Sequence, residues 1–565
     1  MIKKLYLPLC MVVVIALSSC SKMKPLTADS FTVTPSVLEA TGGKVPVTIS
    51  GNFPQSYFKK NAVLKITPVL KWQGGESKGQ TFVFQGEKVQ GNDQVISYLA
   101  GGNATIKDSY DYVPQMAKSE LVLEFAVTVG KKSLNFPSLK IADGVISTST
   151  LITSTVGDAN NAPGHDAFQR IIKEAQQTNI LFLIQQANLR ASELNSVSIK
   201  NFNKQVKEVN AAENKKINNI EVSAYASPDG GLDLNTSLAK SREHNTEIYI
   251  NKQLRSSKVK DIVVDAKYTA EDWNGFQELV SKSNIQDKEL ILRVLSMYSD
   301  PEQREREIKN ISSVYKNLAD EILPQLRRSR LTLNYEIIGK SDEEISRLAD
   351  TDASQLNVEE LLYAATLTDN KAKQETIYNK ATQQFPNDYR AYNNIASLYY
   401  QAGNKDKAEA LYKKAASINA APAVNLNLGL VALSKSDNTA AESYLSKASG
   451  ADYLNEALGN LYIALGQYER AVVSFGNSKT SSAVLAQILV KDYNKAKSTL
   501  DGIADPSAVA NYLAAVLGAR TNNISLLVGS LKKAIQQDSS LGKRATTDIE
   551  FDKYRTNSEF ASIIK

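Results

Sequence analysis

The most constraining feature of this chain is a repeat in its C-terminal half. Ala408, Ala441 and Ala471 are spaced by 33 and then 30 residues, and a large side chain follows each of them by four positions. A small residue also precedes each alanine by twelve positions. A period of this length is typical of repeat architectures, in which a single unit cannot bury its apolar face alone. The repeat therefore predicts a stack of similar units and not one enlarged core.

These positions resemble the tetratricopeptide repeat, a helix pair of about 34 residues in which small residues let the two helices touch. Three units extend over Tyr389–Ser478, a fourth precedes them and degenerate units follow. The tail Phe551–Ile564 is expected to be a capping helix. The resemblance implies an all-α solenoid over 341–565, whose concave groove binds a peptide or helix of a partner protein. A rigid arm without a binding role is the alternative interpretation.

The N-terminus has the pattern of an export signal. Two lysines precede the apolar run Leu5–Leu17, which is too short for the ~20 residues that span a bilayer. The residues Leu17, Ser18, Ser19 and Cys20 resemble the lipobox of bacterial lipoproteins. This resemblance implies that residues 1–19 are a signal peptide and that Cys20 carries the acyl chains of a lipid anchor. A chance cysteine behind a signal peptide cleaved elsewhere is the alternative.

The residues after Cys20 bear on the location of the protein. Ser21 suits sorting to the outer membrane, by analogy with known lipoproteins. Surface lipoproteins of the Bacteroidota often carry an acidic cluster at this point, whereas this chain has Lys22 and Lys24. By resemblance, we expect a Bacteroidota-type outer-membrane lipoprotein that faces the periplasm, with surface exposure as the alternative.

Residues 20–150 have the periodicity of β-strands. Apolar residues occupy every second position in Val45–Ile49 and run nearly unbroken in Leu121–Val127, and glycine pairs mark the turns between such runs. Short strands at this spacing favour a β-sandwich, immunoglobulin-like in type. It would serve as a spacer or a protein-docking face, or it would be purely structural.

The pattern changes in residues 151–340 to alternating strands and helices. Apolar residues over Ile180–Ile184 indicate a buried strand, and those from Ile199 to Val209 recur at helical spacing. The stretch that follows resembles the OmpA-like peptidoglycan-associated module, and the resemblance covers roughly 178–338. The residues on its signature positions are Tyr225, Gly230, Asn235, Leu238 and Arg242.

The departures from this family affect its implied ligand. In the family, an Asp beside the turn and the helix Arg hold the two charged ends of diaminopimelate. Here the Asp position is Ser227, so binding would need Asp229 to reach the same place. The candidate peptidoglycan-binding residues are therefore Asp229, Asn235 and Arg242. A helical insertion over about 268–326 also replaces a short connection, and a docking platform without peptidoglycan binding is the other interpretation.

The composition argues against catalysis. Both Cys residues lie within the first 20 positions, and the only two His residues are His165 and His244. The chain has no phosphate-binding glycine loop and no His pair at metal-ligand spacing, so we expect no cofactor and no metal. A net charge of +6 over 565 residues is too small to indicate a nucleic-acid partner.

These observations predict a lipid-anchored, non-catalytic scaffold of the cell envelope, which binds other envelope proteins through its tetratricopeptide groove. The rival prediction is a wall anchor, in which the OmpA-like domain binds peptidoglycan and the lipid holds the outer membrane to it.

Overall fold

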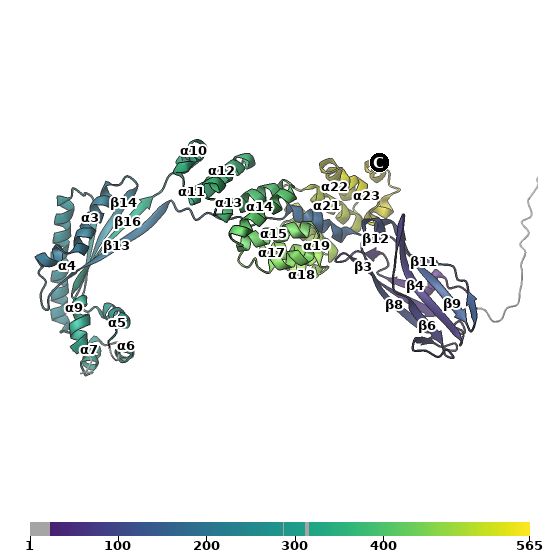
Figure 1. Ribbon diagram of the computed structural model, residues 1–565, viewed down its shortest axis with the longest axis horizontal. Helices are drawn as coiled ribbons and strands as arrows, with labels where there is room; N and C mark the ends of the chain where they lie inside the picture. The colour runs from purple at the N-terminus through teal and green to yellow at the C-terminus, as the bar shows by residue number, and fades with distance from the viewer. Residues whose placement is uncertain (1–22, 286–287, 311–315, 565) are drawn as a thin grey trace, which may run out of the picture. The chain divides into compact units, whose positions relative to one another are not determined.

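Two packed units make up the part of the chain that the computed structural model describes, which is residues 23–285, 288–310 and 316–564. The first, here called the repeat unit, combines the chain up to His165 with the chain from Thr368 onward. The second, the α/β unit, is Asp166–Leu367 (Figure 1). The predicted signal peptide and Cys20 lie outside the described residues. No helix in the described ranges combines the length and the apolar character needed to cross a bilayer.

The N-terminal part of the repeat unit is rich in strands. One sheet has the order β1-β3-β8, and a larger one contains β10-β9-β4-β6-β7, with β11 on β9 and β5 on β4. In β3, Val45, Val47 and Ile49 are buried between more exposed neighbours, as expected for a strand with one face on a core. Side chains from both sheets form one apolar cluster. The strands are β1 Phe31–Thr34, β2 Leu38–Glu39, β3 Lys44–Phe53, β4 Ala62–Trp72, β5 Gly75–Lys78, β6 Phe82–Gly86, β7 Gln94–Ile96, β8 Gly102–Asp111, β9 Ser119–Val129, β10 Lys132–Leu134, β11 Leu139–Asp143 and β12 Val145–Ile146.

The C-terminal part of the repeat unit consists of helix pairs that stack in sequence order. The three aligned alanines are fully buried. A Cβ atom on Gly459 would lie 2.7 Å from the Phe475 ring, so the small residue admits the large one from the next helix, as the repeat pattern predicts. The helices are α12 Lys371–Gln384, α13 Tyr389–Gln401, α14 Lys405–Ile418, α15 Pro422–Ser434, α16 Asn438–Leu445, α17 Leu454–Ala464, α18 Tyr468–Phe475, α19 Ser481–Leu489, α20 Tyr493–Asp501, α21 Ala508–Arg520, α22 Ile524–Gln537, α23 Ser540–Ala545, η7 Ile549–Tyr554 and α24 Ser558–Ile563.

The α/β unit is built on a four-stranded sheet of order β13-β16-β14-β15, in which β14 and β15 are parallel. Helices α3 and α4 cover one face of this sheet (Figure 1). The residues of α3 that are buried are the four that the helical spacing singled out, from Ile199 to Val209. The elements are β13 Ile171–Leu181, α2 Ala191–Leu194, α3 Val197–Ala211, β14 Lys215–Tyr225, α4 Leu232–Ser256, β15 Val263–Thr269 and β16 Arg328–Ile338, followed by α10 Asp342–Thr351, η6 Ala353–Gln355 and α11 Val358–Thr366.

The predicted helical insertion forms a small core of its own between β15 and β16. Its helices are α5 Trp273–Lys282, α6 Lys288–Met297, α7 Pro301–Asn310, η5 Leu318–Ile322 and α9 Leu323–Leu326. Phe276, Val280 and Leu326 belong to this core, and Trp273 packs against it.

Three segments differ from the sequence-based expectations. The strand expected over Ile180–Ile184 ends at Leu181, and Leu183 and Ile184 are 45% and 57% exposed, because the chain leaves the sheet there. Residues 151–165, which we expected to open the α/β domain, pack with the helical repeats instead. Residues 341–367, which we assigned to the solenoid, belong to the α/β unit.

Candidate functional site

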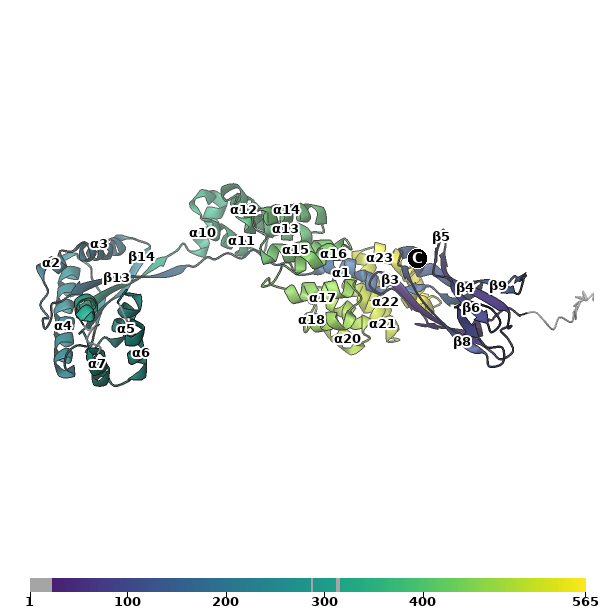
Figure 2. The same cartoon turned by 60° about the horizontal axis from the view of Figure 1, so that its bottom comes forward.

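The segment 147–165 lies along one face of the helical repeats. It begins with η3 Thr148–Leu151, α1 Ile152–Thr155 and η4 Val156–Asp158, and it continues without regular structure to His165. These elements contact α13, α15, α17, α19 and α21, which are the first helices of successive pairs (Figure 2). We call this surface the first-helix face. The chain therefore covers the inner helices of its own repeats.

Three buried asparagines hold the backbone of this segment. Asn427 accepts a hydrogen bond from the Ala162 N–H and donates one to the Ala162 carbonyl, both at 2.8 Å. Asn394 binds Gly164 in the same two-sided way, at 2.7 and 3.0 Å. Asn393 also donates to the Ala162 carbonyl at 3.0 Å and accepts from Asn427. A side-chain amide that bonds both the N–H and the C=O of one residue supplies the hydrogen bonds that a neighbouring β-strand would make. These bonds do not depend on the side chain of the bound residue.

Other contacts extend this arrangement toward the N-terminal part of the segment. The Tyr400 hydroxyl donates to the Val156 carbonyl at 2.6 Å, and burial raises the pKa of Tyr400 far above its usual value. The Ser481 hydroxyl donates to the Asp158 carboxylate at 2.9 Å. Most of these contacts use the backbone of the segment, so they impose little preference for its side chains.

One position of the segment does restrict side-chain size. A Cβ atom on Gly164 would lie 2.7 Å from Cβ and 2.8 Å from Cα of Arg390, which is closer than carbon atoms pack. In contrast, Gly157 faces open space. The first-helix face thus requires a residue without a side chain at position 164.

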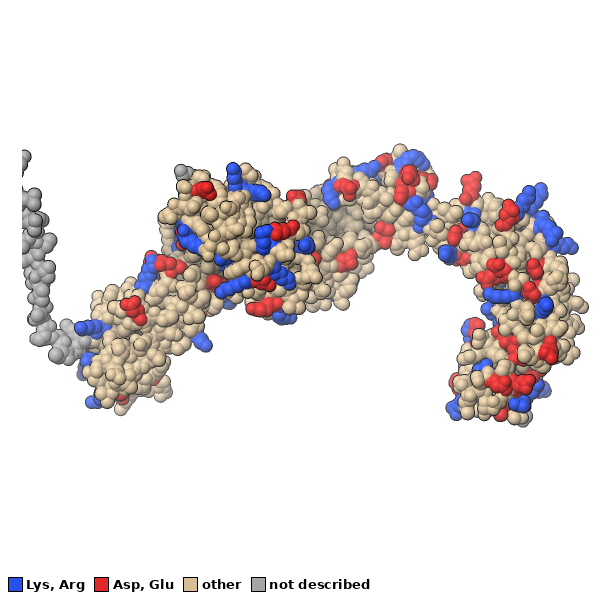
Figure 3. Space-filling view, turned by 180° about the vertical axis from the view of Figure 1, so that it is seen from behind, with Lys and Arg blue, Asp and Glu red and all other residues tan. Residues whose placement is uncertain are grey.

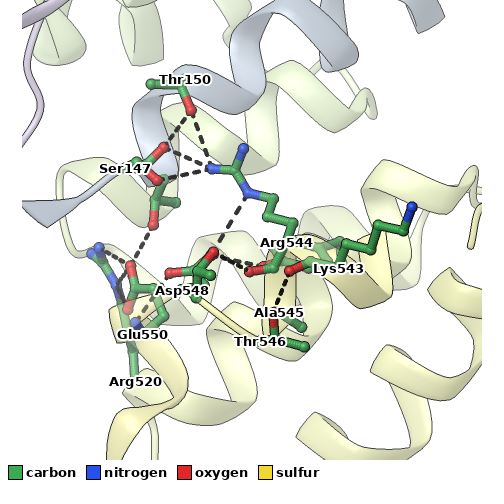
Figure 4. Close-up of polar contacts among 12 residues, drawn as sticks. Ser147, Thr150, Arg520, Lys543, Arg544, Ala545, Thr546, Asp548 and Glu550 are labelled. Carbon is green, nitrogen blue, oxygen red and sulfur yellow. Dashed lines mark hydrogen bonds and ion pairs between the residues drawn. The ribbon is translucent and has the colours of Figure 1, made fainter. Parts of the chain in front are cut away.

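The start of the segment is held by charged residues near the C-terminus (Figure 4). Arg544 donates to the Ser147 carbonyl at 2.9 Å and contacts its hydroxyl at 3.2 Å. Arg520 and Glu550 form a buried ion pair at 2.6 Å, and the Thr148 hydroxyl donates to the same Glu550 carboxylate. The last repeat therefore fastens the point where the chain leaves the N-terminal sheets.

The sequence contains one indication of this site that an analysis of apolar periodicity does not use, namely asparagines at buried helix positions. Asn427 interrupts the apolar run of α15 at a buried position, and Asn393 and Asn394 are buried neighbours in α13. Buried amides in helix interiors need hydrogen-bond partners from elsewhere. Their presence indicates a ligand for that face, but not that the ligand is part of the same chain.

The structure brings the predicted peptidoglycan-binding residues to one end of the α/β unit and supplies partners for each. The Asp229 carboxylate forms an ion pair with Arg327 at 3.1 Å, and the Ser227 hydroxyl donates to it. Arg327 also donates to the Ser227 hydroxyl at 3.2 Å. Asp229 thus sits beside Ser227, as the sequence interpretation requires, but its charge is already balanced by an arginine that we had not singled out.

Arg242 and Asn235 are buried and engaged with the backbone. Arg242 is 1% exposed and donates to the carbonyls of Tyr225, Gln186 and Leu183 at 2.8, 3.0 and 3.4 Å. Burial, assisted by Arg327 and opposed by Asp229, lowers its pKa to about 10. Asn235 donates to the Gly230 carbonyl at 2.8 Å and so holds the turn. A ligand carboxylate reaches Arg242 only if the loop of Leu183 and Gln186 moves.

In the view of Figure 3, basic and acidic side chains are interspersed over both units. Within residues 23–285, 288–310 and 316–564, no group of three or more His, Cys, Asp or Glu side chains is arranged to hold a metal ion.

Comparisons with known proteins support the identity of the repeats. Residues 389–422 match the family model of the tetratricopeptide repeat. No curated protein matches the chain. Similar solved structures include a tetratricopeptide repeat protein from Parabacteroides merdae, at 14% identity over 37% of this chain and 91% of that one, with a TM-score of 0.29.

Two further solved structures are also similar to part of the chain. YrrB, described as a tetratricopeptide protein with an unusual peptide-binding site, is 24% identical over 30% of this chain and 97% of its own, with a TM-score of 0.21. Yeast Tom70 is 10% identical over 58% and 77%, with a TM-score of 0.24. At these values the likenesses say nothing about what this chain binds. The C-terminal helix pairs are tetratricopeptide repeats.

Proposed function

We propose that this protein is a non-catalytic scaffold of the bacterial cell envelope, which is anchored to the outer membrane by lipid on Cys20 and binds other envelope proteins through its tetratricopeptide repeats. In this proposal the body of the protein lies in the periplasm. The N-terminal strands, taken as an immunoglobulin-like β-sandwich, act as the spacer between the lipid and the repeats.

The observation that carries this proposal is the chemistry of the first-helix face. Its asparagines hold an extended backbone by both polar groups of alternate residues, Ala162 and Gly164. This is the interaction that a peptide-binding surface needs. Because the chain's own segment occupies these groups, a partner either displaces it or contacts the second helices of the pairs.

An exposed apolar residue on a second helix favours the latter route, and a second exposed side chain lies in the loop before a first helix. Val473 in α18 is 81% exposed, although large apolar side chains are more often buried. Tyr453, which precedes α17, is 46% exposed. Both are accessible in a protein whose first-helix face is filled.

Site-specific crosslinking in intact cells tests the scaffold function. A photoreactive residue at Val473 or Tyr453 is expected to form adducts with another envelope protein, identified by mass spectrometry. Leu99, which is 71% exposed among the N-terminal strands, is the control position. Adducts that form only at Leu99, or none at any of the three positions, would contradict binding through the repeats.

The lipid anchor has its own test. Cys20→Ser removes the acylated thiol, so the protein is expected to move from the membrane fraction to the periplasmic fraction. Mass spectrometry of the wild-type N-terminus measures the acyl chains directly. A wild-type protein without acyl groups would rule out the anchor and leave the binding function of the repeats to be judged by crosslinking.

Peptidoglycan binding is the second candidate function, because the α/β unit places Asp229, Ser227 and Arg327 in one polar cluster next to Arg242. Sedimentation with purified sacculi tests it. Asp229→Asn and Arg242→Ala should abolish retention, while Asp233→Asn at an exposed position should not. Equal retention of all three variants argues against this site.

A further inference from the structure

The α/β unit has a cavity on the sheet face opposite α3 and α4. Ser329 of β16 and Thr246 of α4 share a hydrogen bond on the helix-covered face. Since neighbouring strand residues point to opposite faces, Arg328 and Arg330 lie on the other face, where both stack on the Tyr225 ring. The start of α5 closes this cavity of about 310 Å³, which is at the small end of ligand pockets.

Two guanidinium groups of this cavity retain free donors. Arg328 is 4% exposed, and its Nε has no hydrogen-bond partner among the described residues. Its other nitrogens donate to the Asp272 carboxylate at 2.8 Å and to the Gln325 carbonyl at 3.1 Å. The Arg330 guanidinium forms no hydrogen bond and no ion pair with the described residues, and it lies 5.9 Å from the Tyr225 ring centre. A buried donor without an acceptor, such as Nε of Arg328, destabilises the protein. A ligand that suits this cavity would therefore supply a hydrogen-bond acceptor.

The carboxylates that line the cavity already have partners. Asp272 accepts from Arg328 and from the Gly275 N–H, the latter at 2.9 Å. Glu278 accepts from Lys282 at 2.6 Å, and Glu271 accepts from the Trp273 indole at 3.0 Å. These three acidic groups would repel a dianion such as phosphate more than a monoanion. The three carboxylates outnumber the two arginines and oppose any anion, so the unpartnered Nε of Arg328, and not the net charge, points to an acceptor, and a monoanion such as a carboxylate is opposed least.

Gly275 lies so close to the Arg328 guanidinium that no side chain fits between them. A Cβ atom at this position would lie 2.2 Å from an Asp272 carboxylate oxygen and 2.6 Å from Nη2 of Arg328. Only a residue without a side chain lets the helix start approach the buried ion pair this closely. The pair is thus built into the contact between the insertion and the sheet.

We propose that this cavity, here called the Arg328–Arg330 site, binds the carboxylate of a small molecule or of a peptide C-terminus. The carboxylate accepts hydrogen bonds from Nε of Arg328 and from the guanidinium of Arg330, and the adjoining group packs on Tyr225. Arg330 is the residue that changes affinity most, because none of the described residues holds it by a hydrogen bond or an ion pair. The site lies on the sheet face away from Arg242 and is independent of the proposed scaffold function.

Titration of the purified full-length protein with N-acetyl-dialanine tests the proposal. We expect saturable binding with Kd of about 1 mM, observed by calorimetry or by chemical-shift changes. Arg330→Met keeps the aliphatic length but removes the donors, and it is expected to weaken binding by at least about tenfold. Arg330→Lys keeps the charge and should recover part of the affinity. Arg255→Met, at an exposed position of α4, is the matched control and should leave binding unchanged.

The ligand arms separate the possible sources of the carboxylate. The C-terminal amide of the same peptide should not bind. Acetate that binds as tightly as the peptide supports the site and assigns it to small free carboxylates. Binding that is equal in wild type and Arg330→Met, equal for acid and amide, or absent for both acetate and the peptide overturns the proposal. Circular dichroism of each variant verifies that the α/β unit is folded.

Discussion

The asparagines of the first-helix face and the arginines of the α/β unit are both buried polar side chains, but they are used in different ways. The first-helix face uses neutral amides, and Asn393, Asn394 and Asn427 are satisfied by the backbone of segment 147–165. The α/β unit uses ions, and Arg242, Arg327 and Arg328 are held by carbonyls or by carboxylates. Amides cost less to bury than ions, so the first arrangement suits a long contact and the second suits a local one.

This difference indicates which hydrogen-bonding groups are available to a ligand from outside the chain. On the first-helix face, Asn394 and Asn427 bind the internal segment through both donor and acceptor, so a new peptide competes there with the protein itself. In the α/β unit, Arg328 and Arg330 retain donors that no described residue accepts from. Four substitutions with their controls test whether buried charges and neutral amides differ in this way.

The largest effect is expected at the buried ion pair of the α/β unit. Arg328→Met leaves the Asp272 carboxylate buried without its counter-ion, which should reduce the local stability of α5 and β16 by about 3–5 kcal/mol. Hydrogen exchange of these elements measures the loss, because unfolding of a chain with several units is not two-state. Arg255→Met should change it by less than about 0.5 kcal/mol. A similarly small change in Arg328→Met would mean that the pair is not needed for the fold.

A smaller loss is expected for the neutral amides. Asn427→Ala removes two hydrogen bonds to Ala162 and one to Asn393, which should destabilise the contact between segment 147–165 and the repeats by about 2–3 kcal/mol. Exchange of the Ala162 amide proton reports this directly. The exposed Asn379→Ala in α12 is the control, with a change within about 0.5 kcal/mol. Unchanged protection of Ala162 would show that the asparagine is not what holds the segment.

A steric test separates shape from hydrogen bonding on the same face. Gly164→Ala forces its Cβ against Arg390 and should cost about 1–3 kcal/mol of the segment's binding. Gly157→Ala introduces the same methyl group into open space in the same segment, so its effect should be close to zero. Both are measured by the exchange rate of the backbone amide proton at position 164. Equal effects of the two substitutions would argue against a size restriction at this position.

The smallest effect concerns a buried carboxylate of the repeat unit. Burial raises the pKa of Asp548 above its usual 3.8, while Arg544 and the Tyr512 hydroxyl oppose the shift. A raised pKa in the folded state means that the unfolded state loses its proton first, so the stabilising contribution is full below pH 3.8 and declines as the pH rises through the folded pKa. Asp548→Asn cannot ionise and should show a shallower decline in thermal stability with pH above this value. Parallel curves for wild type and variant would contradict the raised pKa.

Part of the fold followed from local patterns in the sequence. The spacing of Ala408, Ala441 and Ala471 predicted helix pairs whose small residues admit large ones, as Gly459 and Phe475 do. The spacing from Ile199 to Val209 predicted the buried face of α3. Such patterns work because each residue meets neighbours at fixed offsets within one element.

The candidate sites depended on contacts that have no local pattern. Asn427 binds Ala162 across a separation of 265 residues, and Arg327 meets Asp229 across 98. Residues 147–165 have no repeat of their own, so their sequence indicated neither a helix pair nor a strand. Their position along the first-helix face could not be predicted from periodicity.

The sequence alone indicated the strand-rich N-terminal region, the repeating helix pairs and the buried face of α3, since those properties follow from the periodicity of apolar side chains. Only the tertiary structure decided that the repeats hold a segment of their own chain and that two arginines of β16 face a cavity with free donors. Hydrogen bonds between distant residues cause both arrangements, and a donor in the sequence does not specify which acceptor it will meet.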